Sequence, residues 1–147
     1  MAGTEKYDRR ALSDVRYIVL HHSGVAGDQS AATIANYHVQ SNGWPGIGYH
    51  YLVHPDGLIE YVGDVLTVRY NVASRNKECI GVCLPGDFTS IPPTDQQLAA
   101  ARALVRFLQG VVPAASVVGH GDIALPGWET SCPGATWPGW RQRVEAG

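Results

Sequence analysis

A histidine and a cysteine stand close together in a glycine- and proline-rich stretch near the end of the chain, Gly119 to Gly134. The stretch follows the apolar run Val111 to Val118 and has the composition of a loop, which can fold back and aim His120 and Cys132 at one point. Imidazole nitrogen and thiolate sulfur are ligands that zinc prefers, but two ligands leave its coordination shell incomplete. The stretch alone therefore fits two interpretations: half of a metal site, or a surface histidine and a small buried cysteine.

Two more histidines end an apolar, β-branched run, Val15 to His22, which predicts a buried central strand. Strand ends are where α/β sheets place their functional sites. Zinc in a catalytic site commonly takes three protein ligands and leaves the fourth position to water. His21 or His22 would complete such a set with His120 and Cys132, because each of these residues ends a strand or lies in a loop that follows one.

The remaining histidines and cysteines fit structural roles better. His38, His50 and His54 are the other histidines that could serve as metal ligands. We expect His38 to lie on the surface of a helix or to pack there, and His54, which stands beside a turn, to be exposed. Cys79 and Cys83 are four residues apart in an apolar run that predicts a strand, which separates them by ~13 Å. That distance is beyond disulfide reach, so we interpret both as small buried strand residues.

Composition limits the class of protein. A chain of 147 residues with 45% hydrophobic and 16% charged residues fits one globular domain. Its formal charge of −2 gives no reason to expect a nucleic-acid partner. No apolar run approaches the ~20 residues that cross a bilayer, so we expect no stable membrane insertion. The N-terminus lacks the apolar core of a signal peptide, which predicts synthesis in the cytoplasm without a secretion signal. A single compact domain is expected to be a monomer.

The order of elements predicts an α/β fold with a central mixed sheet flanked by helices. Residues 1–14 are polar and form the expected N-terminal arm. Ser30 and the Thr94-x-x-Gln97 box are helix N-cap signals. In the helix after Ser30 we expect Ile34, Tyr37 and His38 to share one face. The helix after Thr94 has an apolar stripe that we expect to pack on the sheet: Leu98, Ala101, Leu104, Val105 and Leu108. The predicted elements are strands at 15–22, 49–54, 58–62, 79–84 and 116–118, helices at about 30–41, 94–109 and 137–145, and a long irregular connection at 63–78.

Five short pieces of the chain occur in one order, and together they resemble a known family. They are Val19–Ser23, Trp44–Tyr51, Ile80–Cys83, Val118–His120 and Thr130–Gly134. In this order they are similar to the zinc-dependent N-acetylmuramoyl-L-alanine amidases of the type-2 amidase and peptidoglycan recognition protein family, which includes phage lysozyme-type endolysins. The resemblance covers about residues 15–143. It implies a peptidoglycan recognition protein-like amidase domain at 15–147, following the arm at 1–14.

The resemblance assigns roles residue by residue. It implies that His21, His120 and Cys132 bind Zn²⁺ and that Tyr49 is the catalytic tyrosine beside the metal. Thr130 occupies the position two residues before the ligand cysteine, where some phage enzymes have lysine and many recognition proteins have threonine. Tyr49 and Thr130 are thus expected to be catalytic hydroxyl donors.

Other positions are assigned less directly. His22 is not a ligand position in the family and is expected behind the ligands or in the core. Some relatives carry a histidine where this chain has Asn71, which is a departure from their pattern. A long glycan-peptide substrate needs an open groove, and Trp44, Asn71 and Trp128 are the residues expected to bind it, with half-buried packing as the alternative.

The implied reaction is hydrolysis of the amide that joins N-acetylmuramic acid to L-alanine of the stem peptide. Zinc lowers the pKa of its bound water to ~7 and polarises the scissile carbonyl. Tyr49 and Thr130 would stabilise the oxyanion or orient the water. Glu78 and His50 are alternative proton carriers, although a glutamate or histidine beside a strand is more often structural.

Peptidoglycan is therefore the expected partner, and the leading hypothesis is a phage or prophage endolysin that reaches the cell wall after release through a separate membrane lesion. The first alternative is a non-catalytic peptidoglycan-binding module of the same fold. In this family such binders commonly lose the metal cysteine, so Cys132 favours catalysis. A cytoplasmic cell-wall recycling amidase and a zinc hydrolase acting on another amide are the remaining alternatives.

Overall fold

The computed structural model describes residues 6–145, so residues 1–5 of the expected arm and the last two residues of the chain lie outside the described residues. The elements follow one another along the chain as β1 Tyr17–His22, α1 Ala31–Asn42, β2 Tyr51–Val53, β3 Ile59–Tyr61, β4 Cys79–Leu84, α2 Asp95–Val111, β5 Ser116–Gly119, α3 His120–Ile123 and α4 Trp137–Glu145. Two short 3₁₀ turns, Leu12–Asp14 and Asn76–Glu78, precede β1 and β4. Within residues 6–145 no helix has the length and apolarity needed to cross a membrane.

The five strands form one mixed sheet in the order β3-β2-β4-β1-β5. β1 pairs in parallel with β4 and β5, β2 pairs in parallel with β4, and β2 pairs antiparallel with β3. The parallel pairing brings the carboxyl ends of β1 and β4 together, with His21 opposite Cys83. The predicted α/β class with a central mixed sheet is confirmed.

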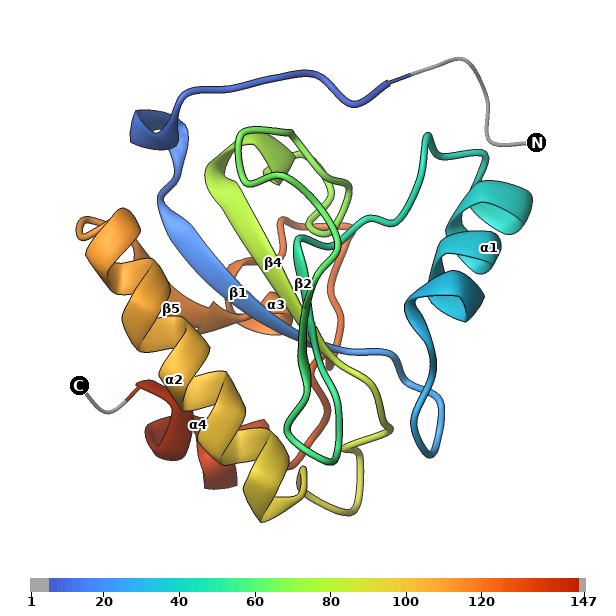
Figure 1. The fold of residues 1–147 in the computed structure, drawn as a ribbon, viewed down its shortest axis with the longest axis vertical. Coiled ribbons are helices and arrows are strands. Elements are labelled where there is room, and N and C mark those ends of the chain that lie inside the picture. The colour runs from blue at the N-terminus through green and yellow to red at the C-terminus, as the bar shows by residue number, and fades with distance from the viewer. Residues whose placement is uncertain (1–5, 146–147) are drawn as a thin grey trace.

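Side-chain alternation along the strands separates the two faces of the sheet. Ile18 and Leu20 of β1 face the main core, which α2 and α4 cover. Val19 and His21 therefore face the opposite side, where a smaller cluster contains Val19. Figure 1 shows α2 and α4 together on one side of the sheet and α1 on the other. His21 thus lies on the face that α1, α3 and the long connection before β4 surround.

The long amphipathic helix α2 forms as its sequence predicts. The Thr94 side chain accepts a hydrogen bond from the backbone N–H of Gln97, which satisfies one free amide at the helix start. The apolar stripe packs into the core and is buried throughout: Leu98, Ala101, Leu104, Val105 and Leu108. The helix continues through Gly110 to Val111, slightly beyond the predicted end.

Helix α1 begins after the predicted N-cap, Ser30, whose side chain accepts from the N–H of Thr33. Its buried residues are Ile34 and His38. The expectation that Tyr37 shares this face is wrong, because Tyr37 is 63% exposed. A helix advances 100° per residue, so Tyr37 points about 100° away from His38. The buried side of α1 is narrow and includes Ile34 and His38 but not Tyr37.

The segment before β1 packs along the long connection. Arg10 is buried, and its guanidinium donates to the carbonyls of Val65 and Cys79 at 3.0 and 2.7 Å. Arg9 forms an isolated antiparallel bridge with Thr67. The connection between β3 and β4 is therefore held by backbone and side-chain hydrogen bonds although it contains little regular structure.

The expectation that His54, in the hairpin β2–β3, is exposed is wrong, because the residue is buried with only 4% of its surface exposed. Its Nδ1 lies 2.7 Å from the Asp28 carboxylate, and its Nε2 contacts the Glu60 carboxylate. Burial of the ring lowers its pKa, but the hydrogen bonds and charges of the two carboxylates outweigh burial and raise the pKa of His54 above its usual 6.5. The imidazolium therefore ties the loop after β1 to the hairpin.

This tie predicts a pH-dependent stability. A pKa raised by folding adds stability that is fully present below the unfolded value of about 6.5 and is lost as the pH rises through the folded pKa. We expect the difference in free energy of unfolding between the wild type and His54→Gln to fall as the pH rises above about 6.5, by about 1.4 kcal/mol per unit of raised pKa. Urea denaturation with a chelator present measures it, and a difference that stays constant with pH would contradict the assignment.

Candidate metal centre

Three residues that are distant in sequence bring their ligand atoms together at the carboxyl end of β1. Within residues 6–145, His21, His120 and Cys132 are the group of histidine, cysteine and carboxylate residues whose ligand atoms meet, all within 4.8 Å of one another. The Cys132 Sγ lies 3.7 Å from His21 Nδ1. The structure therefore assembles the three residues that the sequence predicted as ligands, and it selects His21 rather than His22.

Strand β1 supplies the buried member of the group. His21 follows Val19 on the face away from α2, and it is 1% exposed. Its ring lies 5.1 Å from the Tyr49 ring and 4.8 Å from the His120 ring, measured between centroids. A central strand with partners on both sides cannot shift easily, so this ligand has a fixed position.

A short helix supplies the second member, where the sequence predicted only a loop. His120 is the first residue of α3. The Asp122 carboxylate accepts from the N–H of Gly119 at 2.8 Å and from Trp137 Nε1 at 3.0 Å. Asp122 therefore fixes the turn that carries His120, a role that the sequence reasoning missed. The signal was present, because an acidic residue three positions after Gly119 has the spacing of a helix-capping box.

Hydrogen bonds to two other segments of the chain hold Cys132. Its carbonyl accepts from the N–H of Gly121 at 2.8 Å, and its sulfur accepts from the N–H of His22 at 3.4 Å. A Cβ at Gly121 would lie 2.4 Å from the Thr130 carbonyl oxygen, so only glycine permits this approach. The eleven residues between His120 and Cys132 are thus closed into a loop whose two ends touch.

The donor set fits a zinc ion. Zinc–nitrogen and zinc–sulfur bonds in a tetrahedral site place neighbouring ligand atoms about 3.4–3.6 Å apart, close to the observed sulfur–nitrogen distance. Burial, together with the neighbouring His120, lowers the pKa of His21 well below its usual range, and burial lowers that of His120. Both imidazoles are therefore neutral, as metal ligands must be. Burial raises the pKa of the Cys132 thiol to about 12, against the opposing effect of the His22 N–H, so a cation has to displace its proton.

The other central histidines have backbone partners. His22 Nδ1 accepts from the N–H of Phe88, and His38 Nδ1 accepts from the N–H of Gly48. His50 accepts from the N–H of Gly81 and donates to a carbonyl through Nε2. Burial lowers the pKa of His38 to about 4 and that of His50 to about 3. These residues hold the backbone in place.

The two predicted hydroxyl donors differ in setting. Tyr49, two residues before β2, packs against His21, and burial raises its pKa well above the usual range, which keeps the phenol protonated. Thr130 is exposed, and its hydroxyl oxygen accepts from the N–H of Cys132 at 3.2 Å. The Thr130 hydroxyl proton is left available to donate. Glu78 stands at the other end of β4 and pairs with Arg16 and Arg75, away from the ligands.

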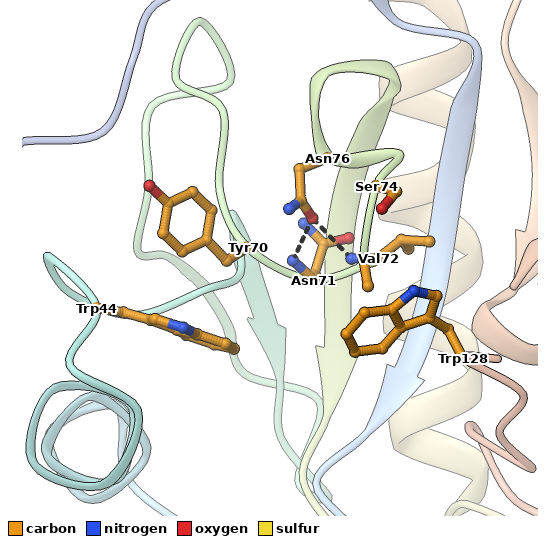
Figure 2. A pocket seen from close by; sticks show the side chains of 8 residues that line it. Trp44, Tyr70, Asn71, Val72, Ser74, Asn76 and Trp128 are labelled. Carbon is orange, nitrogen blue, oxygen red and sulfur yellow. Dashed lines mark hydrogen bonds between the residues drawn. The ribbon is translucent and has the colours of Figure 1, made fainter. Parts of the chain in front are cut away.

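An open hollow with a volume of about 500 Å³ is lined in part by Asn71, whose side chain contacts the candidate ligand His21. Figure 2 shows Trp44 and Trp128 on opposite sides of it, with Asn71 between them. Trp128 is 59% exposed. The structure thus brings the three residues expected to bind substrate to one hollow. Asn71 also contacts His21, which the sequence did not indicate.

Both the sequence and the fold of this chain are similar to those of known proteins. Residues 11–135 match the family model described as N-acetylmuramoyl-L-alanine amidase. An endolysin of Enterobacteria phage K11 is 32% identical over 102 residues, which are 66% of this chain and 67% of that protein. A peptidoglycan-recognition protein of Drosophila melanogaster is 32% identical over 152 residues, 91% of this chain and 80% of that protein. The solved structure of the Ph2119 endolysin from Thermus scotoductus MAT2119 bacteriophage Ph2119 superposes with a TM-score of 0.84 at 29% identity and covers 97% of this chain and 92% of that one.

The backbone of Gly121 lies so close to the Thr130 carbonyl that an added methyl group should disturb the site. We expect Gly121→Ala to push the α3 turn away from the Cys132 segment, at a cost of about 1–3 kcal/mol of stability, and to weaken zinc binding. Isothermal titration calorimetry with zinc measures the affinity. Gly110→Ala in α2 is the matched control, because a Cβ there meets nothing within 4 Å. Equal zinc affinity in both variants would show that the approach does not set the ligand geometry.

Proposed function

The chain belongs to the N-acetylmuramoyl-L-alanine amidase family, and on this premise we propose that it binds zinc through His21, His120 and Cys132 and uses it to hydrolyse the amide between N-acetylmuramic acid and L-alanine. The chain is an amidase that hydrolyses peptidoglycan. The observation that carries the zinc assignment is the set of two neutral imidazoles and one thiol within 4.8 Å, beside an open hollow.

Zinc at these ligands supplies a water of lowered pKa and polarises a carbonyl. The protein groups around it perform the remaining tasks. Hydrolysis of an amide passes through a tetrahedral oxyanion, which needs hydrogen-bond donors at a fixed position. Tyr49 is suited to this role because its phenol is protonated and its ring is packed against His21. Thr130 offers a second hydroxyl from the segment that carries Cys132.

The hollow is the proposed binding site for the glycan-peptide. Trp44 and Trp128 present indole rings on its two sides, and apolar ring faces stack well on sugars. Asn71 lines the hollow between them. An open hollow suits a polymer, because a chain that continues in both directions cannot enter a closed cavity.

We place the enzyme as an endolysin that acts on the bacterial cell wall as a monomer. The similarity to the endolysins of phages K11 and Ph2119 supports this role over that of a recycling amidase. The rival function is peptidoglycan binding without catalysis. The complete ligand set supports catalysis, because a binding module has no need for a buried thiol beside two imidazoles.

The proposed activity depends on both the metal and the Cys132 thiol. Purified peptidoglycan incubated with the enzyme should release new N-terminal L-alanine without new reducing sugar ends. A chelator should abolish this release, added zinc should restore it, and Cys132→Ala should remain inactive with zinc present. Cys79→Ala is the matched control, because Cys79 is a buried strand cysteine far from the ligands.

The outcomes separate the hypotheses. Amide cleavage that survives complete removal of the metal would refute the zinc mechanism. New reducing ends would assign the activity to the glycan bond instead. Retention of the protein on peptidoglycan with no cleavage under any metal condition would support the binding module.

The Tyr49 phenol can be tested apart from its ring. Tyr49→Phe removes one oxyanion donor and keeps the ring that packs on His21, so kcat should fall by ~10²–10³ while zinc affinity stays unchanged. Kinetics on a soluble muramoyl-peptide and calorimetry with zinc measure the two quantities. Thr130→Val tests the second hydroxyl in the same way. An unchanged kcat in Tyr49→Phe would remove the tyrosine from the catalytic residues.

A further inference from the structure

The side-chain amide of Asn71 connects the candidate ligand His21 to the backbone of two neighbouring segments. Asn71 is 8% exposed. Its Oδ1 lies 3.1 Å from His21 Nε2, and its Nδ2 donates to the carbonyls of Gly48 and Arg69 at 3.3 and 3.2 Å. The amide therefore uses both of its ends on protein groups.

These contacts determine how the amide is oriented. The carbonyl oxygens of Gly48 and Arg69 can only accept hydrogen bonds, so the amide nitrogen has to face them. The amide oxygen is then left facing His21, and an oxygen of this kind can only accept. His21 Nε2 must consequently carry the ring proton. In a neutral imidazole the other nitrogen, Nδ1, has the lone pair, and Nδ1 is the atom that lies 3.7 Å from the Cys132 sulfur.

Asn71 is itself held in place. The Asn76 Oδ1 accepts from the backbone N–H groups of Asn71 and Val72, at 2.9 and 2.8 Å (Figure 2). Gly81 in the middle of β4 gives the side chain its space, because a Cβ there would lie 2.7 Å from the Asn71 Cγ. A glycine inside a buried strand weakens the strand, and here it allows a side chain to approach the sheet closely. The amide thus cannot turn to serve another partner without losing several contacts.

We propose that Asn71 is a positioning residue for the metal ligand His21, which it holds with the proton on Nε2 and the Nδ1 lone pair aimed at the site. Ligand histidines commonly donate their second nitrogen to an acceptor, and loss of that acceptor typically weakens metal binding about 10- to 100-fold. This inference rests on the proposed zinc site. It gives Asn71 a role different from direct contact with substrate, although the residue also lines the hollow.

Two substitutions separate the acceptor from the size of the side chain. Asn71→Leu has the same number and branching of heavy atoms but no acceptor, and we expect it to bind zinc about 10- to 100-fold more weakly than the wild type. Asn71→Asp keeps an oxygen toward His21 and loses the donor toward the carbonyls, so it should be less stable yet retain most of the zinc affinity. Lys77→Ala, an exposed position on the same connection, is the matched control and should leave zinc affinity unchanged. Competition with a chromophoric chelator measures each affinity without substrate.

The tautomer provides an independent test that needs no variant. Nitrogen-15 NMR of the metal-free wild type should show His21 protonated at Nε2 and unprotonated at Nδ1. Protonation at Nδ1 overturns the inference, and so does Asn71→Leu with the zinc affinity of the wild type. A higher KM in Asn71→Leu with zinc affinity intact would assign Asn71 to substrate binding. If the wild type itself binds no zinc, the proposed function fails first, and that result is distinguishable from the others.

Discussion

Cys132 is anchored twice, by its sulfur to the N–H of His22 at the end of β1 and by its carbonyl to the N–H of Gly121 in α3. The first of these hydrogen bonds joins segments 110 residues apart in sequence, and the rest of the site depends on the pair. Closing a chain over such a distance costs conformational entropy, which the packing of the whole sheet offsets. The packing of the fold thus places the candidate ligand atoms within 4.8 Å of one another. Gly121 tolerates no side chain, because the Thr130 carbonyl occupies the space that a Cβ would need.

The six histidines of the chain show how the fold separates structural from ligand roles. Three of them accept a backbone N–H at Nδ1 and so have no lone pair left at that atom: His22, His38 and His50. His54 is held between two carboxylates. His21 and His120 are the histidines whose ring nitrogens reach Cys132 and each other. The histidines outside the proposed metal site are thus occupied by backbone groups or carboxylates, which leaves His21 and His120 as its candidate imidazole ligands.

Local signals predicted the parts of the structure that depend on neighbours in sequence. The Thr94 cap and the apolar stripe of α2 are examples, since both need only residues close along the same helix. The burial of His54 could not be predicted in this way, because its partner Asp28 is 26 residues away. Tyr37 failed for a related reason: periodicity gives the face of a helix but not how much of that face the sheet covers. The ligand set came from the resemblance to a family, whereas its geometry came from contacts such as that of Asn71 with His21, which no local pattern encodes.

The charge of the proposed site follows from groups that are neutral before zinc binds. Burial keeps the imidazoles unprotonated and the Cys132 thiol protonated, so the folded chain does not have to bury three charges in the absence of a cation. Zinc binding would replace the thiol proton, and one thiolate compensates only half of a double positive charge. The site would then keep a net positive charge near the protonated phenol of Tyr49, whose ring packs against His21. A developing oxyanion is attracted to such a site more strongly than the neutral amide from which it forms, and this difference is what lowers a barrier.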